Sequence, residues 1–221
     1  MKTPRLPQTD FANYAMLPSS VRASVLKGHS TYVPPYTLEP FRKSLTEICN
    51  VQQGLFQFEP SPLEIVLRHV RSKCQKHPKS EGMCTDVAEA LWEHVQEKKI
   101  YCEARIVERV SMGAGWSVNY WHDFYMVEDG KLISPFFDGR KGQTRLNHDG
   151  ALFVCSMIHH FLARGRFRNL VPRVYQFPER KHQRVVEVIE FERDQLLGID
   201  ELEERVTETA ALWNVIVKNA A

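Results

Sequence analysis

The chain has 221 residues, of which 43% are hydrophobic and 25% are charged, and its formal net charge is +2. These values are typical of one domain with a substantial core, and a charge so close to zero indicates no particular class of partner. The region after Met1 lacks the apolar run of a cleavable signal, and no stretch approaches the roughly 18 apolar residues of a membrane span. We therefore expect no membrane partner and a cytoplasmic protein, although export by a signal-independent route is compatible with the same sequence.

Five cysteines lie scattered along the chain: Cys49, Cys74, Cys84, Cys102 and Cys155. An odd number without repeated short spacings argues against a disulfide framework, so we expect reduced thiols.

Residues 1–60 contain seven prolines, which break long helices, interleaved with aromatic and aliphatic residues. This composition predicts an irregular arm that packs on the core, with one short helix within residues 37–51, because disordered tails are poor in aromatic residues. We expect the catalytic core to span residues 61–192. A C-terminal helix, residues 193–221, would belong to the same domain.

Two helices are predicted at the start of the core. The first begins at Ser61-Pro62 and ends near His77-Pro78, since its apolar residues recur at helical spacing. The second begins at about Met83, and its apolar stripe from Cys84 to Val95 ends at Glu97.

Strand signals follow the second helix. We expect strands at residues 101–110, 119–128 and 131–137, with a loop at 112–118 and a hairpin turn at Asp129-Gly130. A helix over 151–162, a strand over 185–191 and a long helix from Asp194 complete the prediction. The fold class is therefore α+β, with a helix packed on an antiparallel sheet.

Three chemically reactive residue types occur in an informative order: Cys84, His122 and Asp138. A thiol near a helix N-terminus is acidified by the helix dipole, a histidine can accept its proton, and a carboxylate can orient that histidine. The turn at Asp129-Gly130 would bring Asp138 close to His122 across the two strands. These three residues are the predicted catalytic set.

This segment resembles the transglutaminase-like superfamily of the papain-like fold. The resemblance covers about residues 62–140 and rests on Gly82-x-Cys84 at the head of an Ala-rich helix, His122 with alternating apolar residues after it, and Pro135-Phe136-Phe137-Asp138. Phe124 stands where the family often has Trp, and the ending around Asp138 is altered. Asp123 and Asp129 are weaker candidates for the carboxylate.

The resemblance implies a cysteine-dependent acyl-transfer enzyme, a hydrolase or acyltransferase that acts through a Cys84 thioester. Cys84 would attack a carbonyl, His122 would move the proton, and Asp138 would stabilise the imidazolium. The Cys84 backbone N–H would stabilise the oxyanion. The substrate would be a protein, a peptide or a carrier-bound acyl group, with no cofactor and no metal.

Other interpretations remain open. Cys84 could be a silent core thiol in a non-catalytic binding module on the same scaffold, or the chain could be an arylamine N-acetyltransferase-like acyltransferase. Zinc ligation at Cys74-x-x-His77 lacks a fourth ligand. The basic stretch 164–184 could bind an anionic partner, whereas nucleic acid is not expected there.

Overall fold

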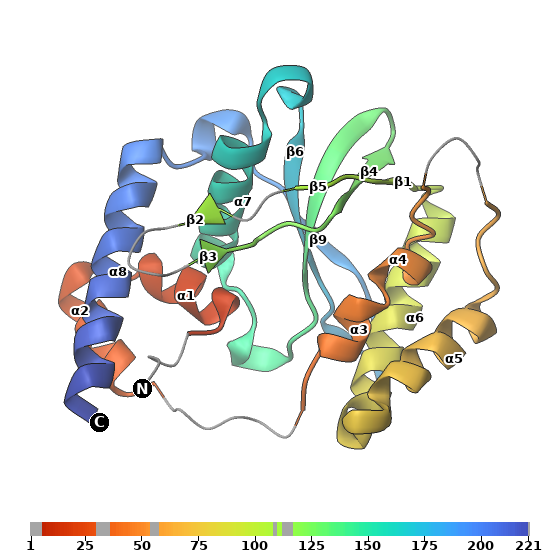
Figure 1. Ribbon diagram of the computed structural model, residues 1–221, viewed down its shortest axis with the longest axis horizontal. Coiled ribbons are helices and arrows are strands. Elements are labelled where there is room, and N and C mark those ends of the chain that lie inside the picture. The colour runs from red at the N-terminus through yellow and green to blue at the C-terminus, as the bar shows by residue number, and fades with distance from the viewer. Residues whose placement is uncertain (1–5, 30–35, 54–57, 108–109, 112–116, 221) are drawn as a thin grey trace.

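The computed structural model describes residues 6–29, 36–53, 58–107, 110–111 and 117–220. A central sheet separates two groups of helices, and α6 and α7 lie on opposite faces of that sheet (Figure 1). The helices are α1 (Gln8–Ala15), α2 (Ser19–Lys27), α3 (Glu39–Lys43), α4 (Leu45–Ile48), α5 (Leu63–Lys73), α6 (Glu81–Glu97), α7 (His148–Leu162) and α8 (Ile199–Ala220).

Over the residues that the structure describes, the main sheet has five strands in the order β1-β4-β5-β6-β9. Its strands are β1 (Tyr101–Ala104), β4 (Phe124–Glu128), β5 (Lys131–Asp138), β6 (Val171–Gln176) and β9 (Glu187–Ile189). Strands β5 and β6 run parallel, joined through α7, while the other neighbours are antiparallel. Elsewhere in the described residues, β2 (Val110–Ser111) pairs antiparallel with β3 (Ser117–Val118), and β7 (Glu179–Arg180) pairs antiparallel with β8 (Gln183–Arg184).

Side-chain alternation along the central strands builds a separate core on each face of the sheet. Phe136 and Val174 point to the face covered by α1, α7 and α8. Their neighbours Phe137 and Tyr175 belong to the core under α3–α6, which also contains Cys84. Consecutive residues of β5 or β6 therefore point to opposite faces of the sheet and belong to different cores.

The N-terminal region is more regular than its prolines predict. Pro7 and Pro18 stand immediately before α1 and α2, where proline is tolerated because the first helical N–H groups need no intrahelical acceptor. Phe11, Ala12 and Ala15 of α1 are buried in the same core as α7 and α8. The expectation of an irregular arm is therefore wrong for α1 and α2, and residues 37–51 contain two short helices where one was expected.

The predicted α+β class is confirmed, together with the helices near 61–77, 83–97 and 151–162 and the strand near 187–189. The all-antiparallel sheet is wrong, because β6 was not predicted and pairs parallel with β5. The strand expected from residue 119 begins at Phe124, which leaves His122 in the segment before it.

Candidate functional site

Cys84 lies inside an apolar layer and not at an open helix end. It is the fourth residue of α6, which begins at Glu81, and its side chain is fully buried. At this position helical geometry directs the backbone N–H to the carbonyl of the N-cap residue Ser80, so it is not free to stabilise an oxyanion. Sequence reasoning placed the helix start two residues too late, and the oxyanion role depended on that error.

The Cys84 thiol is held in its neutral form. It donates a hydrogen bond to the carbonyl oxygen of Thr37 at 3.4 Å. The pKa of this thiol is raised to about 12, mainly by burial and to a smaller extent by the neighbouring Cys74. The acidic thiol expected from the helix dipole is therefore not what the structure contains.

His122 packs among aromatic rings of the same apolar layer. Its ring centroid lies 5.2 Å from that of Phe137 and 5.7 Å from that of Phe124. Burial lowers the pKa of His122 to about 4, and the charge of Arg42 lowers it as well. This histidine is neutral near pH 7 and sits in surroundings that disfavour an imidazolium.

Asp138 lies on the opposite face of the sheet from Cys84. The ladder pairs Met126 with Ile133 and Glu128 with Lys131, so the same register extended to His122 places it opposite Phe137. A shift of one residue moves a side chain to the other face of a sheet. The structure therefore does not bring Asp138 to His122, and no hydrogen bond joins Cys84, His122 and Asp138, all three of which it describes.

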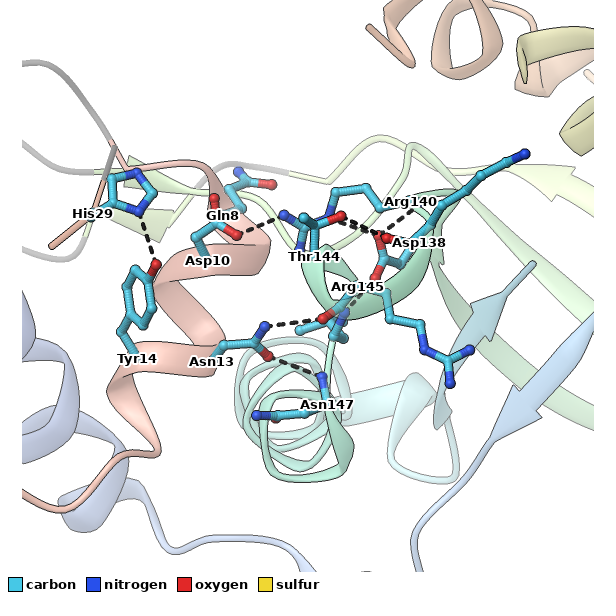
Figure 2. Close-up of polar contacts among 12 residues, drawn as sticks. Gln8, Asp10, Asn13, Tyr14, His29, Asp138, Arg140, Thr144, Arg145 and Asn147 are labelled. Atoms are coloured by element: carbon cyan, nitrogen blue, oxygen red, sulfur yellow. Dashed lines mark hydrogen bonds and ion pairs between the residues drawn. The ribbon is translucent and has the colours of Figure 1, made fainter. Parts of the chain in front are cut away.

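Asp138 is instead the centre of a polar junction between β5, α1 and the start of α7 (Figure 2). Its carboxylate accepts hydrogen bonds from the Leu146 backbone N–H at 2.6 Å and from the Arg140 Nε at 3.2 Å. Arg140 also pairs with Asp10 of α1 at 2.7 Å. Asp138 is only 3% exposed, so it holds the loop between β5 and α7 in place.

A second contact between the same elements involves Asn13. Its amide donates to the Arg145 carbonyl oxygen and accepts from the Asn147 backbone N–H, each at 3.1 Å (Figure 2). Gly150 lies against this side chain, because a Cβ on Gly150 would approach the Asn13 oxygen to 2.1 Å. The β5–α7 loop is thus fixed to α1 from two sides.

An exposed aromatic residue follows the short helices α3 and α4. Phe58 is 64% exposed, yet its backbone is held on both sides by one buried side chain, that of Gln52. The Gln52 carbonyl oxygen accepts from the Phe58 N–H at 2.7 Å, and its amide donates to the Phe58 carbonyl at 3.1 Å. Gln52 is anchored in turn by backbone hydrogen bonds to β1. The pairing of Gln52 with Phe58 depends on the fold and was not predicted from the sequence.

The basic stretch 164–184 is not one continuous surface. Arg173 lies in the inner strand β6 and pairs with Glu128 at the end of β4 and with Glu190, which follows β9. Arg180 pairs with Glu187, and Arg166 lies over the ring of Phe167. Arg184 is turned inward and is buried.

Within the described residues, no group of three or more His, Cys, Asp and Glu side chains is arranged to hold a metal ion. None of the helices in this part of the chain combines the length and apolar character needed to cross a membrane.

Comparison with known proteins identifies the family. Residues 9–220 match the model of a family described as sliding clamp-binding bacterial toxin SocB. The chain belongs to the SocB family. A relative from Caulobacter vibrioides (strain NA1000 / CB15N), the DNA replication inhibitor toxin SocB, is 29% identical over 225 residues, which cover 99% of this chain and 92% of the relative. No solved structure matches the chain.

Membership of the SocB family corrects the functional prediction from sequence. The resemblance to the transglutaminase-like superfamily is wrong, and so is the prediction of a cysteine acyl-transfer enzyme with a thioester intermediate, because the family and the relative are described by binding and by inhibition of replication. The arylamine N-acetyltransferase alternative and the acyl substrate fail with it. The non-catalytic binding protein, kept as an alternative, is the better description, and the catalytic roles of Cys84, His122 and Asp138 are not carried further.

Proposed function

We propose that this chain binds a bacterial sliding clamp and inhibits DNA replication by occupying it. The observation that carries the proposal is the match of the SocB family over residues 9–220, supported by a relative that aligns with nearly the whole chain. A protein that acts on the clamp works where DNA is replicated, which supports the expected cytoplasmic location. The neutral state of the buried Cys84 and the partly buried His122 agrees with a protein that acts by binding.

The contact surface that we propose is the Phe58 segment, defined as Gln52 to Pro60. An exposed aromatic side chain is a typical anchor of a protein interface, because burying it on binding removes a large apolar area from water. The two hydrogen bonds between the Gln52 side chain and the Phe58 backbone, one donated by each residue, fix that backbone before the partner arrives. Such preorganisation reduces the ordering cost of association.

The sequence of the same segment supports this choice. Leu55 and Phe56 precede Phe58, so three large apolar residues lie close together in the chain. Residues 54–57 are outside the described part of the structure, and their place in the proposal rests on sequence alone. Short segments with closely spaced apolar anchors are a recurring way for a protein to occupy a groove on a partner.

Clamp binding tests the surface. The full chain is passed over the immobilised sliding clamp of its own host, and the dissociation constant is measured by surface plasmon resonance. We expect Phe58→Ser and the double variant Leu55→Ser/Phe56→Ser each to weaken binding at least about tenfold, since an apolar anchor contributes upwards of roughly 1.4 kcal/mol. Val215→Ser, which removes another exposed apolar residue, from α8 across the sheet, should bind as the wild type does.

Replication inhibition tests the function itself. In a primer-extension reaction that depends on the clamp, the wild-type chain should reduce DNA synthesis, and added free clamp should restore it. Inhibition that excess clamp does not relieve would contradict the proposal. Unchanged clamp binding by both segment variants would retain the clamp as target and reject the Phe58 segment as its contact.

A further inference from the structure

A pocket of about 810 Å³ opens at one end of the central sheet, and neither Cys84 nor Phe58 lines it. It lies beyond the carboxyl ends of the parallel strands β5 and β6, where ligands commonly bind in sheets with parallel strands. Its volume falls in the range of about 300–1,000 Å³ that is usual for small-molecule sites. The residues that line it include Arg140, Lys141, Arg145, His148 and Arg184.

Arg184 is a buried cation with incomplete hydrogen bonding. It is 8% exposed, and its Nη1 donates to the Phe177 carbonyl oxygen. Its Nε and Nη2 have no hydrogen-bond partner among the described residues. Burial lowers the pKa of this guanidinium, opposed by the charges of Glu179 and Asp86 at a distance. A buried guanidinium with free N–H groups lowers the stability of the folded state unless an anion accepts hydrogen bonds from those groups.

The carboxylates around the pocket are already engaged by other cations. Glu179 pairs with Lys141 at 2.7 Å, and Glu187 pairs with Arg180. Asp10 and Asp138 both pair with Arg140, whose Nη2 is nevertheless buried without a partner.

Arg145 adds a second uncompensated charge. Its half-buried guanidinium forms no ion pair within the described part of the chain, and Figure 2 shows it extended away from Asp138. The wall also includes the first residue of α7, and a helix N-terminus favours anions through its dipole and free N–H groups. The pocket therefore presents positive charge on more than one side.

The remaining lining indicates what kind of anion would fit. Leu146, Pro178 and Ile189 form an apolar part of the wall, and the volume exceeds what a bare inorganic ion fills. Guanidinium groups bind the oxygens of phosphate in paired hydrogen bonds, while apolar side chains accommodate an uncharged organic body. We propose that this pocket binds a small phosphorylated molecule of nucleotide size, with Arg184 and Arg145 pairing its phosphate oxygens. This inference does not depend on clamp binding.

Thermal unfolding of the full chain tests the pocket with ADP, inorganic pyrophosphate and adenosine as probes. A ligand that binds only the folded state raises the melting temperature with concentration. We expect ADP to raise it more than pyrophosphate does, and adenosine to leave it nearly unchanged because it lacks phosphate. Calorimetric titration of ADP then gives the dissociation constant.

Three variants test whether ADP binds in this pocket. Arg184→Met and Arg145→Gln should each weaken ADP binding by about tenfold or more, the loss of one or more charge-assisted hydrogen bonds. Arg168→Gln removes an exposed cation at the opposite end of β6 and should bind ADP as the wild type does. Arg184→Met should fold at least as stably as the wild type without ligand, because it removes an unpaired buried charge.

Several outcomes would overturn the proposal. One is the absence of any shift with ADP or pyrophosphate. Another is an equal shift with adenosine, which would show that the charges do not recognise phosphate. A shift that survives in both Arg184→Met and Arg145→Gln would place binding elsewhere. A response to a single-stranded oligonucleotide alone would replace the small molecule with nucleic acid.

Discussion

The two faces of the central sheet give polar side chains opposite surroundings: apolar packing on one face and hydrogen-bond partners on the other. Under α6, Cys84 and His122 are packed among apolar groups, and the pKa of each is moved so that the neutral form is favoured. On the α7 face, Asp138 is equally buried but receives hydrogen bonds from Leu146 and Arg140. Phe137 and Asp138 are consecutive residues of β5, yet they point into these two different environments. The surroundings of a polar residue, more than its type, therefore determine its chemistry.

The largest expected effect concerns the reactivity of Cys84. Because burial raises the pKa of its thiol from 9.0 to about 12, the thiolate fraction near pH 7.5 should be smaller by roughly a thousandfold than in an unperturbed thiol. We expect iodoacetamide to label Cys84 at least that much more slowly in the folded chain than in urea, as measured by peptide mass spectrometry. If Cys84 is labelled rapidly below pH 8 and His122→Phe abolishes that labelling, the thiol is reactive and the contrast between the two faces of the sheet is wrong.

The next effect is on stability at the polar junction. Asp138→Ala leaves the Leu146 N–H and the Arg140 Nε without their acceptor, and we expect a loss of about 3 kcal/mol in the free energy of unfolding. Asp138→Asn keeps an acceptor oxygen and should cost less. Urea denaturation measures both, with the exposed Asp123→Ala as a control that should change stability by less than about 0.5 kcal/mol. Equal losses at residues 123 and 138 would contradict a structural role for the junction.

The smallest effect is a pH dependence caused by His122. Its pKa is about 4 in the folded chain and near the ordinary 6.5 when unfolded, so the unfolded state binds more protons between these values. Stability should therefore fall as the pH is lowered through this window, by about 1 kcal/mol between pH 7 and 5.5. His122→Phe keeps a ring beside Phe124 and Phe137 and should reduce the slope. Parallel curves for the wild type and the variant would show that this histidine is not buried as described.

Local patterns predicted the elements whose residues repeat regularly. The apolar stripe of α6 and the Asp129-Gly130 turn both occur as expected, because helical spacing and a left-handed turn residue are encoded locally. Strand β6 was not predicted, since Arg173 made its sequence look like a charged surface. The acids that neutralise Arg173, Glu128 and Glu190, come from β4 and the chain after β9, and only the folded sheet brings them together.

The predicted pairing of Asp138 with His122 failed through a single register step. Counting outward from the turn placed Asp138 opposite His122, whereas the observed ladder places Phe137 there. One residue along a strand separates the two faces, so an error too small to change the predicted elements was enough to change the site. The sequence could not indicate that Arg184 lacks hydrogen-bond partners for its Nε and Nη2. That property depends on which acceptors the folded chain places beside the guanidinium.

The contacts of α1 and α2 with α8 have a consequence for folding during synthesis. Arg22 pairs with Glu208 across 186 residues of chain, and Arg205 donates to the Ala15 carbonyl oxygen. The apolar faces of α1 and α2 therefore leave the ribosome long before α8 exists to cover them. At 5–20 residues per second, roughly ten seconds or more separate the two events. During that interval the nascent chain presents uncovered apolar surface that chaperones and proteases can recognise.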